Sequence, residues 1–191
     1  MEYSTLDKLG VRVSRLGFGC MRFPLTAEGK IDEPRAAAML DTAYKAGVTY
    51  YDTAYFYHQH TGEAFLGRAM KRYPRDTFYL ATKMPMSIVE SLDHAKEIFE
   101  GQLAALQTDY VDFYLLHGVN GERWKQAQEM GIVDFLLEMQ KAGRIRHFGF
   151  SFHGSYEEFE TILTARDWDF CQIQYNYMDQ EIQAGMRGYA L

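Results

Sequence analysis

Six short segments rich in β-branched and aromatic residues alternate with six segments of helical periodicity along the 191-residue chain. We expect strands at 15–20, 48–52, 77–83, 110–117, 145–151 and 169–175, and helices at 33–46, 63–71, 88–106, 123–142, 156–165 and 181–190. This alternation predicts an α/β fold with a parallel sheet, because parallel strands are joined by long, usually helical crossovers. Two architectures remain, an open doubly wound sheet and a closed (β/α) barrel.

Residues with capping chemistry lie at several of the expected helix ends. Asp32, Ser87 and Ser155 can each accept a hydrogen bond from an amide of the first helical turn, and a glutamate follows each serine by three residues. Gly47 and Gly143 follow two expected helices, where glycine tolerates left-handed backbone geometry. These signals support the predicted helix boundaries.

Polar or ionisable side chains close five consecutive expected strands. They are Asp52, Lys83, His117, Ser151 and Gln174. In a barrel the carboxyl ends of the strands converge on one face, where active sites of this architecture lie. An open dinucleotide-binding sheet needs a glycine-rich GxGxxG turn after its first strand, and the sequence GFGCM does not supply one. The barrel is therefore the favoured architecture.

A complete (β/α)8 TIM barrel has eight strand–helix units and typically about 250 residues. The sequence supplies about six units, so we expect residues 1–191 to form an incomplete barrel domain without strands seven and eight. The first and sixth strands would then be unpaired edges, which favour pairing with other chains. We expect either a part of a longer protein or self-association through these edges.

Composition excludes several classes of protein. A net charge of −6 argues against nucleic-acid binding, which usually needs a basic surface. No apolar segment approaches the roughly 20 residues that span a membrane, and the N-terminal residues do not resemble a secretion signal. Cys20 and Cys171 lie far apart in the sequence and belong to no metal-binding cluster. We expect a cytoplasmic protein with no nucleic-acid or membrane partner and no metal site.

The strand ends and the loop after the second strand offer proton-transfer chemistry. An ammonium group near a phenol favours the phenolate, so we expect Lys83 to lower the pKa of Tyr57 from about 10. Asp52 would hold Lys83 charged and oriented, and His117 would hydrogen-bond a substrate oxygen. Together these four residues predict a site that moves a proton to or from a carbonyl or alcohol oxygen.

Several segments resemble, in order, the signature blocks of the aldo-keto reductase family: GVTYYDTAYFYHQHTGEAFLG, YLATK, TDYVDFYLLH, GRIRHFGFS and QIQYNY. The resemblance implies a (β/α)8 barrel that reduces a small aldehyde or ketone with NADPH or NADH. The catalytic aspartate, tyrosine, lysine and histidine of the family fall on Asp52, Tyr57, Lys83 and His117, with Tyr57 as the general acid.

The same resemblance implies the cofactor contacts. Ser151 and Gln174 would bind the nicotinamide carboxamide, and Asp52 would lie near the ribose. Phe152 stands where many members of the family place an asparagine. The segments YHQHTGE and SFHG resemble the branch with a ferredoxin-like iron–sulfur segment near its C-terminus. The sequence lacks such a cysteine cluster, so we expect no iron–sulfur cluster in this chain.

Each predicted catalytic residue also has a simpler interpretation. Taken singly, Asp52 is equally explained as a cap, Lys83 as a solvated strand-end lysine, and His117 as a core histidine bonded to backbone. The same residues also match the family in order and spacing. Such a match would be improbable if every one of the simpler interpretations held, so we favour the catalytic interpretation. The alternative for the whole chain is a non-catalytic, cofactor-binding regulatory subunit or an inactive fragment of a reductase.

Two further sets of residues have weaker signals. His58 and His60 suggest a metal pair, but no third ligand follows at helical or strand spacing. Tyr55, Phe56 and Trp124 are candidates for the mouth of a substrate pocket, although aromatic residues are more often core.

Overall fold

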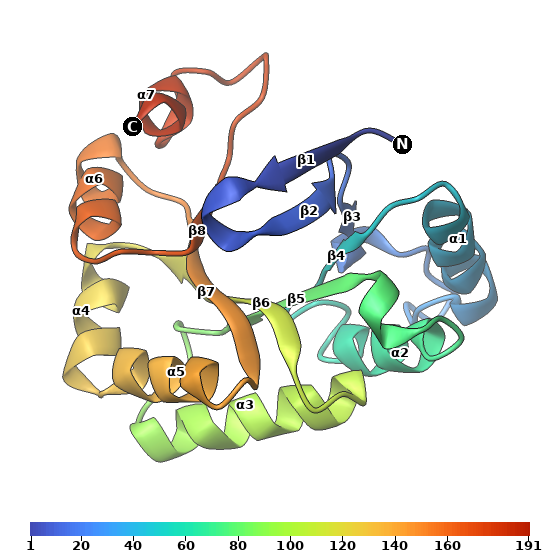
Figure 1. The fold of residues 1–191 in the computed structure, drawn as a ribbon. Coiled ribbons are helices and arrows are strands. Elements are labelled where there is room, and N and C mark those ends of the chain that lie inside the picture. The colour runs from blue at the N-terminus through green and yellow to red at the C-terminus, as the bar shows by residue number, and fades with distance from the viewer.

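A computed structural model describes residues 1–191, with one curved, parallel sheet and helices along its outer side (Figure 1). The six strands of this sheet pair in chain order. They are β3 (Phe18–Gly19), β4 (Tyr50–Asp52), β5 (Tyr79–Met84), β6 (Val111–Val119), β7 (Ile145–Phe152) and β8 (Phe170–Ile173). The predicted arrangement of strand and helix units is confirmed. β3 and β8 are the two edges, as expected, and self-association through them stays a prediction.

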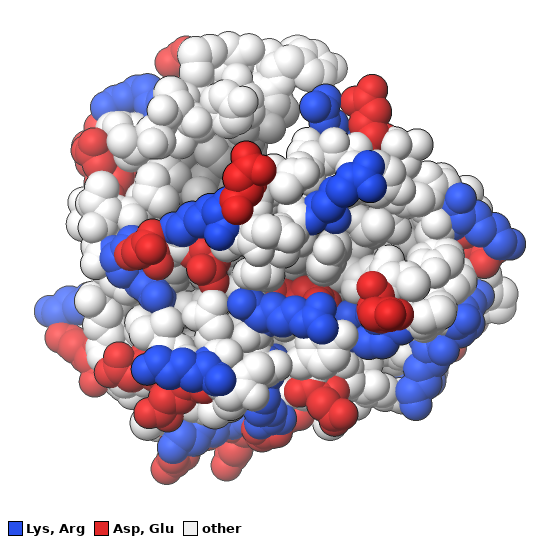
Figure 2. Space-filling model, in the orientation of Figure 1, with Lys and Arg blue, Asp and Glu red and all other residues white.

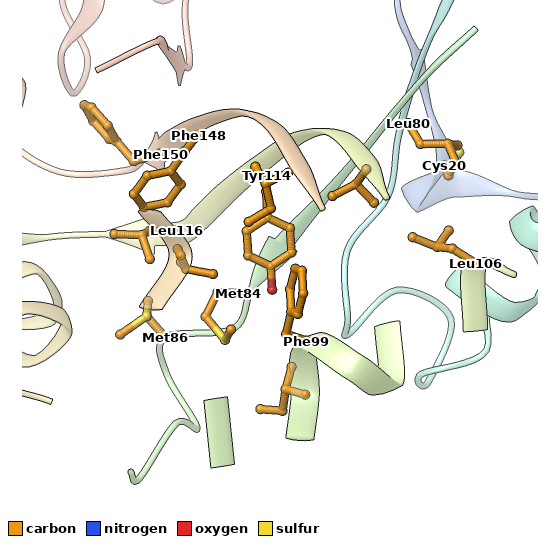
Figure 3. Packing of buried hydrophobic residues seen from close by; sticks show 14 of the residues in the cluster. Cys20, Leu80, Met84, Met86, Phe99, Leu106, Tyr114, Leu116, Phe148 and Phe150 are labelled. Atoms are coloured by element: carbon orange, nitrogen blue, oxygen red, sulfur yellow. The ribbon is translucent and has the colours of Figure 1, made fainter. Parts of the chain in front are cut away.

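The helices cover the convex side of the sheet and bury their apolar faces against it (Figure 1). They are α1 (Glu33–Lys45), α2 (Gly62–Met70), α3 (Leu92–Leu106), α4 (Gly121–Glu129), α5 (Ile132–Lys141), α6 (Tyr156–Thr164) and α7 (Gly185–Ala190). The main core contains 39 buried residues. At its centre the Tyr114 ring of β6 meets the Phe99 ring of α3 edge-on, with centroids 5.3 Å apart (Figure 3).

An antiparallel hairpin that the sequence did not predict packs over the concave side of the sheet. It consists of β1 (Tyr3–Leu6) and β2 (Val11–Ser14). Val11 joins Ala81 and Phe113 of the sheet in a second, smaller apolar cluster. Lys8, in the turn between the two strands, donates to Trp168 O at 2.7 Å. The hairpin therefore covers apolar side chains on the inner face and reaches the segment that enters β8.

Several predicted helix ends are confirmed. Asp32 accepts from Arg35 N at 3.2 Å, and Ser155 with Glu158 forms a complete capping box. The glycines after α1 and α5 adopt positive φ, 87° at Gly47 and 75° at Gly143.

Three predicted helices have different bounds. The third begins four residues later than expected because Ser91, and not Ser87, accepts from a first-turn amide, at 3.1 Å. The segment 123–142 is two helices, since Gly131 takes a left-handed conformation (φ 70°) between α4 and α5. The last helix covers only 185–190. The longest helix, α3, has 15 residues, and none of the helices could span a membrane.

Candidate active site

The predicted strand-end residues gather at one end of the sheet. A cavity of about 210 Å³ is lined by Tyr57, Lys83, His117, Ser151, His153, Gln172, Ile173 and Gln174. Five of the six residues predicted as catalytic or cofactor-binding thus share one cavity. The sixth, Asp52, lies directly beside it and is bonded to Lys83.

Lys83 is the most buried charge of the site, with 2% of its surface exposed. Alternation along β5 turns Leu80 and Met84 toward the helices and Ala81 and Lys83 toward the concave side. Lys83 Nζ donates to Asp52 Oδ1 at 2.6 Å and to Thr53 O at 2.7 Å. An ammonium this deeply buried requires such partners, because an unpaired charge is costly away from water.

Asp52 is the last residue of β4. Burial raises the pKa of its carboxyl group, and the charge of Lys83 opposes that change. Its second oxygen, Oδ2, is buried and accepts no hydrogen bond, and the hydroxyl of the neighbouring Thr53 is also unpaired. Buried polar atoms normally have partners, so Asp52 has an unsatisfied acceptor beside the cavity.

Tyr57 lies on the loop after β4, with Lys83 Nζ 5.4 Å from its ring centroid. The expected shift toward phenolate is wrong. Burial, followed by the negative charge of Asp52, raises the pKa of Tyr57 to about 12. Lys83 stands over the ring and is paired with Asp52, so its charge does not favour the phenolate enough to compensate. The resting site therefore holds a protonated phenol.

His117 is oriented by an irregularity in β6. The register between β6 and β7 shifts between Leu116 and Val119, and Gly118 in this bulge has a φ of 56°. β-Bulges of this kind re-aim side chains near active sites. Burial, followed by electrostatic interactions with Lys83, His153 and Arg123, lowers the pKa of His117 to about 4. The imidazole is therefore neutral near pH 7 and can donate or accept one hydrogen bond.

The two predicted carboxamide contacts both have protein partners. Ser151 Oγ accepts from Gly118 N at 2.8 Å and thereby supports the bulge beside His117. Gln174 Oε1 accepts from Gln183 Nε2 at 3.0 Å. Both side chains still line the cavity. They have structural contacts in addition to the ligand contacts that the sequence predicts.

A model of the aldo/keto reductase family matches residues 15–191. The chain belongs to this family. Aldo-keto reductase YhdN of Bacillus subtilis is 30% identical over 200 residues, which include the whole chain and 58% of that relative. This chain therefore spans a little more than half the length of that curated protein. The family is one of oxidoreductases, and carbonyl reduction is its general chemistry.

Solved structures of the family have the same fold. The holo form of aldo-keto reductase AKR11C1 from Bacillus halodurans superposes with a TM-score of 0.77 at 30% identity, over 94% of this chain and 59% of that one. An aldo-keto reductase from Klebsiella pneumoniae in complex with NADPH has a TM-score of 0.63 at 25% identity, over 84% of this chain and 53% of that one. These similarities identify the sheet and its helices as part of a (β/α)8 barrel.

A buried polar network behind the lysine of this aldo/keto reductase chain was not predicted. Gln102 Nε2 of α3 donates to Lys83 O at 3.0 Å and to Glu63 Oε1 of α2 at 2.8 Å. Tyr114 donates to Gln102 Oε1 at 2.6 Å, and Thr82 donates to Glu63. The network fixes β5 against two helices. Glu63 lies within one of the segments that resemble the family, but Gln102 is a single glutamine in a helix, and nothing in the sequence indicates that it supports Lys83.

The loop that follows Tyr57 has an unusual backbone. His58, Gln59 and His60 have φ values of 53°, 54° and 67°. Three consecutive left-handed residues other than glycine are costly and persist only when neighbouring contacts hold them. His58 Nε2 lies 3.0 Å from Cys20 O and 3.3 Å from Phe23 N, which ties the loop to the segment after β3.

The weaker predictions have mixed outcomes. No group of three or more potential ligand side chains surrounds His58 or His60. Phe56 is 38% exposed and lines a second cavity beside Tyr57. The prediction that Trp124 lies at the mouth of a pocket is wrong. Trp124 is buried and packs against Trp168, with ring centroids 5.3 Å apart. Its α4 position turns it toward the core.

Proposed function

We propose that this chain carries the proton-transfer site of an NAD(P)H-dependent reductase that converts a small aldehyde or ketone to an alcohol. The observation that supports this most directly is the arrangement of Tyr57, Lys83 and His117 around one cavity, with Lys83 paired to Asp52. A phenol, a buried ammonium and a neutral imidazole together provide what a carbonyl oxygen needs when it becomes a hydroxyl group.

Each residue has a distinct role in this proposal. Tyr57, with a pKa of about 12, is protonated at neutral pH and donates its proton to the carbonyl oxygen. The phenolate that this leaves is stabilised by Lys83 above its ring, and Asp52 keeps Lys83 in place. His117 stays neutral because its pKa is about 4, and its ring N–H aligns the carbonyl oxygen.

The residues present fit a nicotinamide dinucleotide. Ser151 and Gln174 offer a hydroxyl and an amide, which match the donors and acceptors of a carboxamide. Asp52 Oδ2 is buried without a hydrogen bond and suits a sugar hydroxyl. When bound, NADPH or NADH would supply the hydride. The NADPH complex of the Klebsiella pneumoniae relative favours this class of cofactor.

A second candidate is a chain that binds the cofactor without turnover, as a regulatory subunit or as an inactive fragment. The chain covers 58% of its Bacillus subtilis relative. In TIM barrels the loops after the last two strands commonly bind phosphate. The substrate and activity of the whole protein, and its location in the cytoplasm, are proposals as well.

One pair of measurements separates these candidates. Nicotinamide fluorescence reports binding of NADPH, and oxidation of NADPH in the presence of an aldehyde reports turnover. Tyr57→Phe should keep binding and lose turnover by roughly 10²- to 10⁴-fold, the usual contribution of general acid catalysis. Tyr79→Phe, a control on the same sheet next to Phe113, should change neither. Binding without turnover in the unmodified chain would favour the second candidate, and a Tyr57→Phe variant with most of its turnover would refute the first.

A further inference from the structure

A second cavity, of about 440 Å³, adjoins the first around Tyr57. It is lined by Met21, Arg22, Phe56, Tyr57, His58, His117 and His153. Tyr57, His117 and His153 belong to both cavities, so the second one opens onto the same phenol. The first cavity carries the hydroxyl and amide groups suited to a cofactor. The second is therefore the space in which a substrate would reach Tyr57.

The wall of this second cavity is cationic or neutral. It contains one arginine and three histidines, with no aspartate or glutamate. Arg22 forms no ion pair, hydrogen bond or ring contact within the chain. Every other arginine has a carboxylate, a backbone carbonyl or an aromatic ring as its partner. A guanidinium left free at the wall of a site is available to a ligand.

The backbone that carries Arg22 is fixed. Arg22 ends a short 3₁₀ helix, Cys20–Arg22, and lies between two buried residues, Cys20 and Phe23. His58 Nε2 contacts both Cys20 O and Phe23 N, at 3.0 Å and 3.3 Å. The same histidine follows Tyr57 directly in the chain. Arg22 and Tyr57 are thus held in one unit, and the positive charge of Arg22 also acts to lower the pKa of Tyr57.

We propose that the substrate of this site is an aldehyde or ketone that carries a carboxylate, with Arg22 binding the carboxylate while Tyr57 and His117 face the carbonyl oxygen. This inference rests on the proposed function. A guanidinium offers a planar fork that matches a carboxylate. A single guanidinium balances the single charge of a carboxylate, whereas a phosphate ester carries close to two. Met21 and Phe56 supply apolar contact for the hydrocarbon between the two ends.

Calorimetric titration tests this without requiring turnover. The probes are 4-carboxybenzaldehyde, its methyl ester methyl 4-formylbenzoate, and 4-formylphenyl phosphate. The unmodified chain should bind the acid at least about tenfold more tightly than the ester, because a charge-assisted hydrogen bond typically contributes that much. Arg22→Met should lower the affinity for the acid to that for the ester and leave the ester unchanged. Arg22→Lys should restore part of the preference.

A matched control is available at the end of α5. Lys141 is exposed and forms no ion pair, and it precedes the start of β7, whereas the site lies at the carboxyl end of that strand. Lys141→Met therefore removes one positive charge away from the site and should leave all three affinities unchanged. Equal binding of acid and ester, no binding of either, or an Arg22→Met variant that still prefers the acid would overturn the inference. Tighter binding of the phosphate than of the acid would also overturn it. NADPH oxidation is measured separately. A chain that prefers the acid but reduces nothing would contradict the proposed function and leave standing only the binding of a carboxylate by Arg22.

Discussion

The middle of the curved sheet and its C-terminal edge are built in different ways. In the middle, Lys83 is 2% exposed, has two hydrogen bonds of its own and rests on a network from two helices. At the edge, Tyr177, Met178 and Tyr189 are 85%, 76% and 71% exposed. Figure 2 shows uncharged surface in the upper part of the molecule, where α7 lies, with a few charged groups at its margin. Asp52, Lys83 and His117 thus lie on strands with neighbours on both sides, and Tyr57 lies on the loop after one of them. The proposed cofactor contact Gln174 instead directly follows an edge strand.

The residues proposed for proton transfer and the residue proposed for cofactor binding are therefore held in place by different kinds of contact. The Asp52–Lys83 pair is held by burial and by backbone that belongs to β4 and β5. Gln174 is held by one side-chain contact with Gln183, which has a positive φ of 57°. We therefore expect mutations in the middle to change global stability and mutations at the edge to act locally.

The largest effect is expected for Lys83→Met. It leaves Asp52 as a buried carboxylate without its partner, and breaking a buried pair typically costs about 3–5 kcal/mol. Chemical denaturation measures this loss. The matched change at the edge is Arg187→Met, which removes an exposed ion pair with Glu157 and a contact with the Tyr156 ring, and should cost about 1 kcal/mol. Similar losses in the two variants would remove the proposed distinction.

The next effect is a pH dependence that originates at His117. Its folded-state pKa is about 4, against about 6.5 in an unfolded chain. As pH falls below 6.5 the unfolded chain binds the proton first, so stability is fully present above that pH and is lost down to about pH 4. The expected loss is at most about 3 kcal/mol.

Denaturation at a series of pH values should therefore give a shallower curve for His117→Asn than for the unmodified chain. His94→Asn, on the outer helix α3, serves as a control for the loss of a histidine. If the two variants have the same pH dependence over this range, His117 is not the residue responsible.

Much of the fold could be predicted from the sequence because strand and helix patterns alternate along it. The polar residues at the ends of the predicted strands identified most of the candidate site. The N-terminal hairpin was missed because Tyr3–Leu6 and Val11–Ser14 are four residues each, too short for a clear period. Ser87 and Ser91 have similar capping chemistry, and only tertiary packing decides between them. The direction of the Tyr57 pKa was wrong because the sequence shows which charges are near but not how completely they are buried or already paired.

Gly149→Ala should produce an intermediate effect that begins at the edge. A Cβ at Gly149 would lie 2.3 Å from Phe170 O, its partner across the β7–β8 pair. Overpacking against backbone typically costs about 1–3 kcal/mol, and here it would push β8 away from β7. Hydrogen exchange should show faster exchange of β8 amides with β5 unchanged.

The control for Gly149→Ala is a glycine-to-alanine change that should raise stability instead of lowering it. Gly101 lies inside α3, and a Cβ there would meet nothing within 4 Å. Gly101→Ala should stabilise the protein by about 0.5–1 kcal/mol, since glycine in a helix interior is unfavourable. A Gly149→Ala variant as stable as the unmodified chain would show that β8 adjusts without loss of pairing.

The smallest effect is expected for Tyr189→Ala in α7. The Tyr189 ring stacks on Tyr175 with centroids 5.0 Å apart and planes 8° apart, but the two residues are 71% and 41% exposed. An aromatic pair adds about 0.5–1.5 kcal/mol in general, so this exposed pair should contribute less than about 1 kcal/mol. Tyr177→Ala, at a tyrosine 85% exposed with no ring partner, is the matched control and isolates the stack. Hydrogen exchange should detect the change in α7 alone. Faster exchange in β5 or β6 of the Tyr189→Ala variant would show that the edge supports the middle of the sheet, contrary to the comparison drawn above.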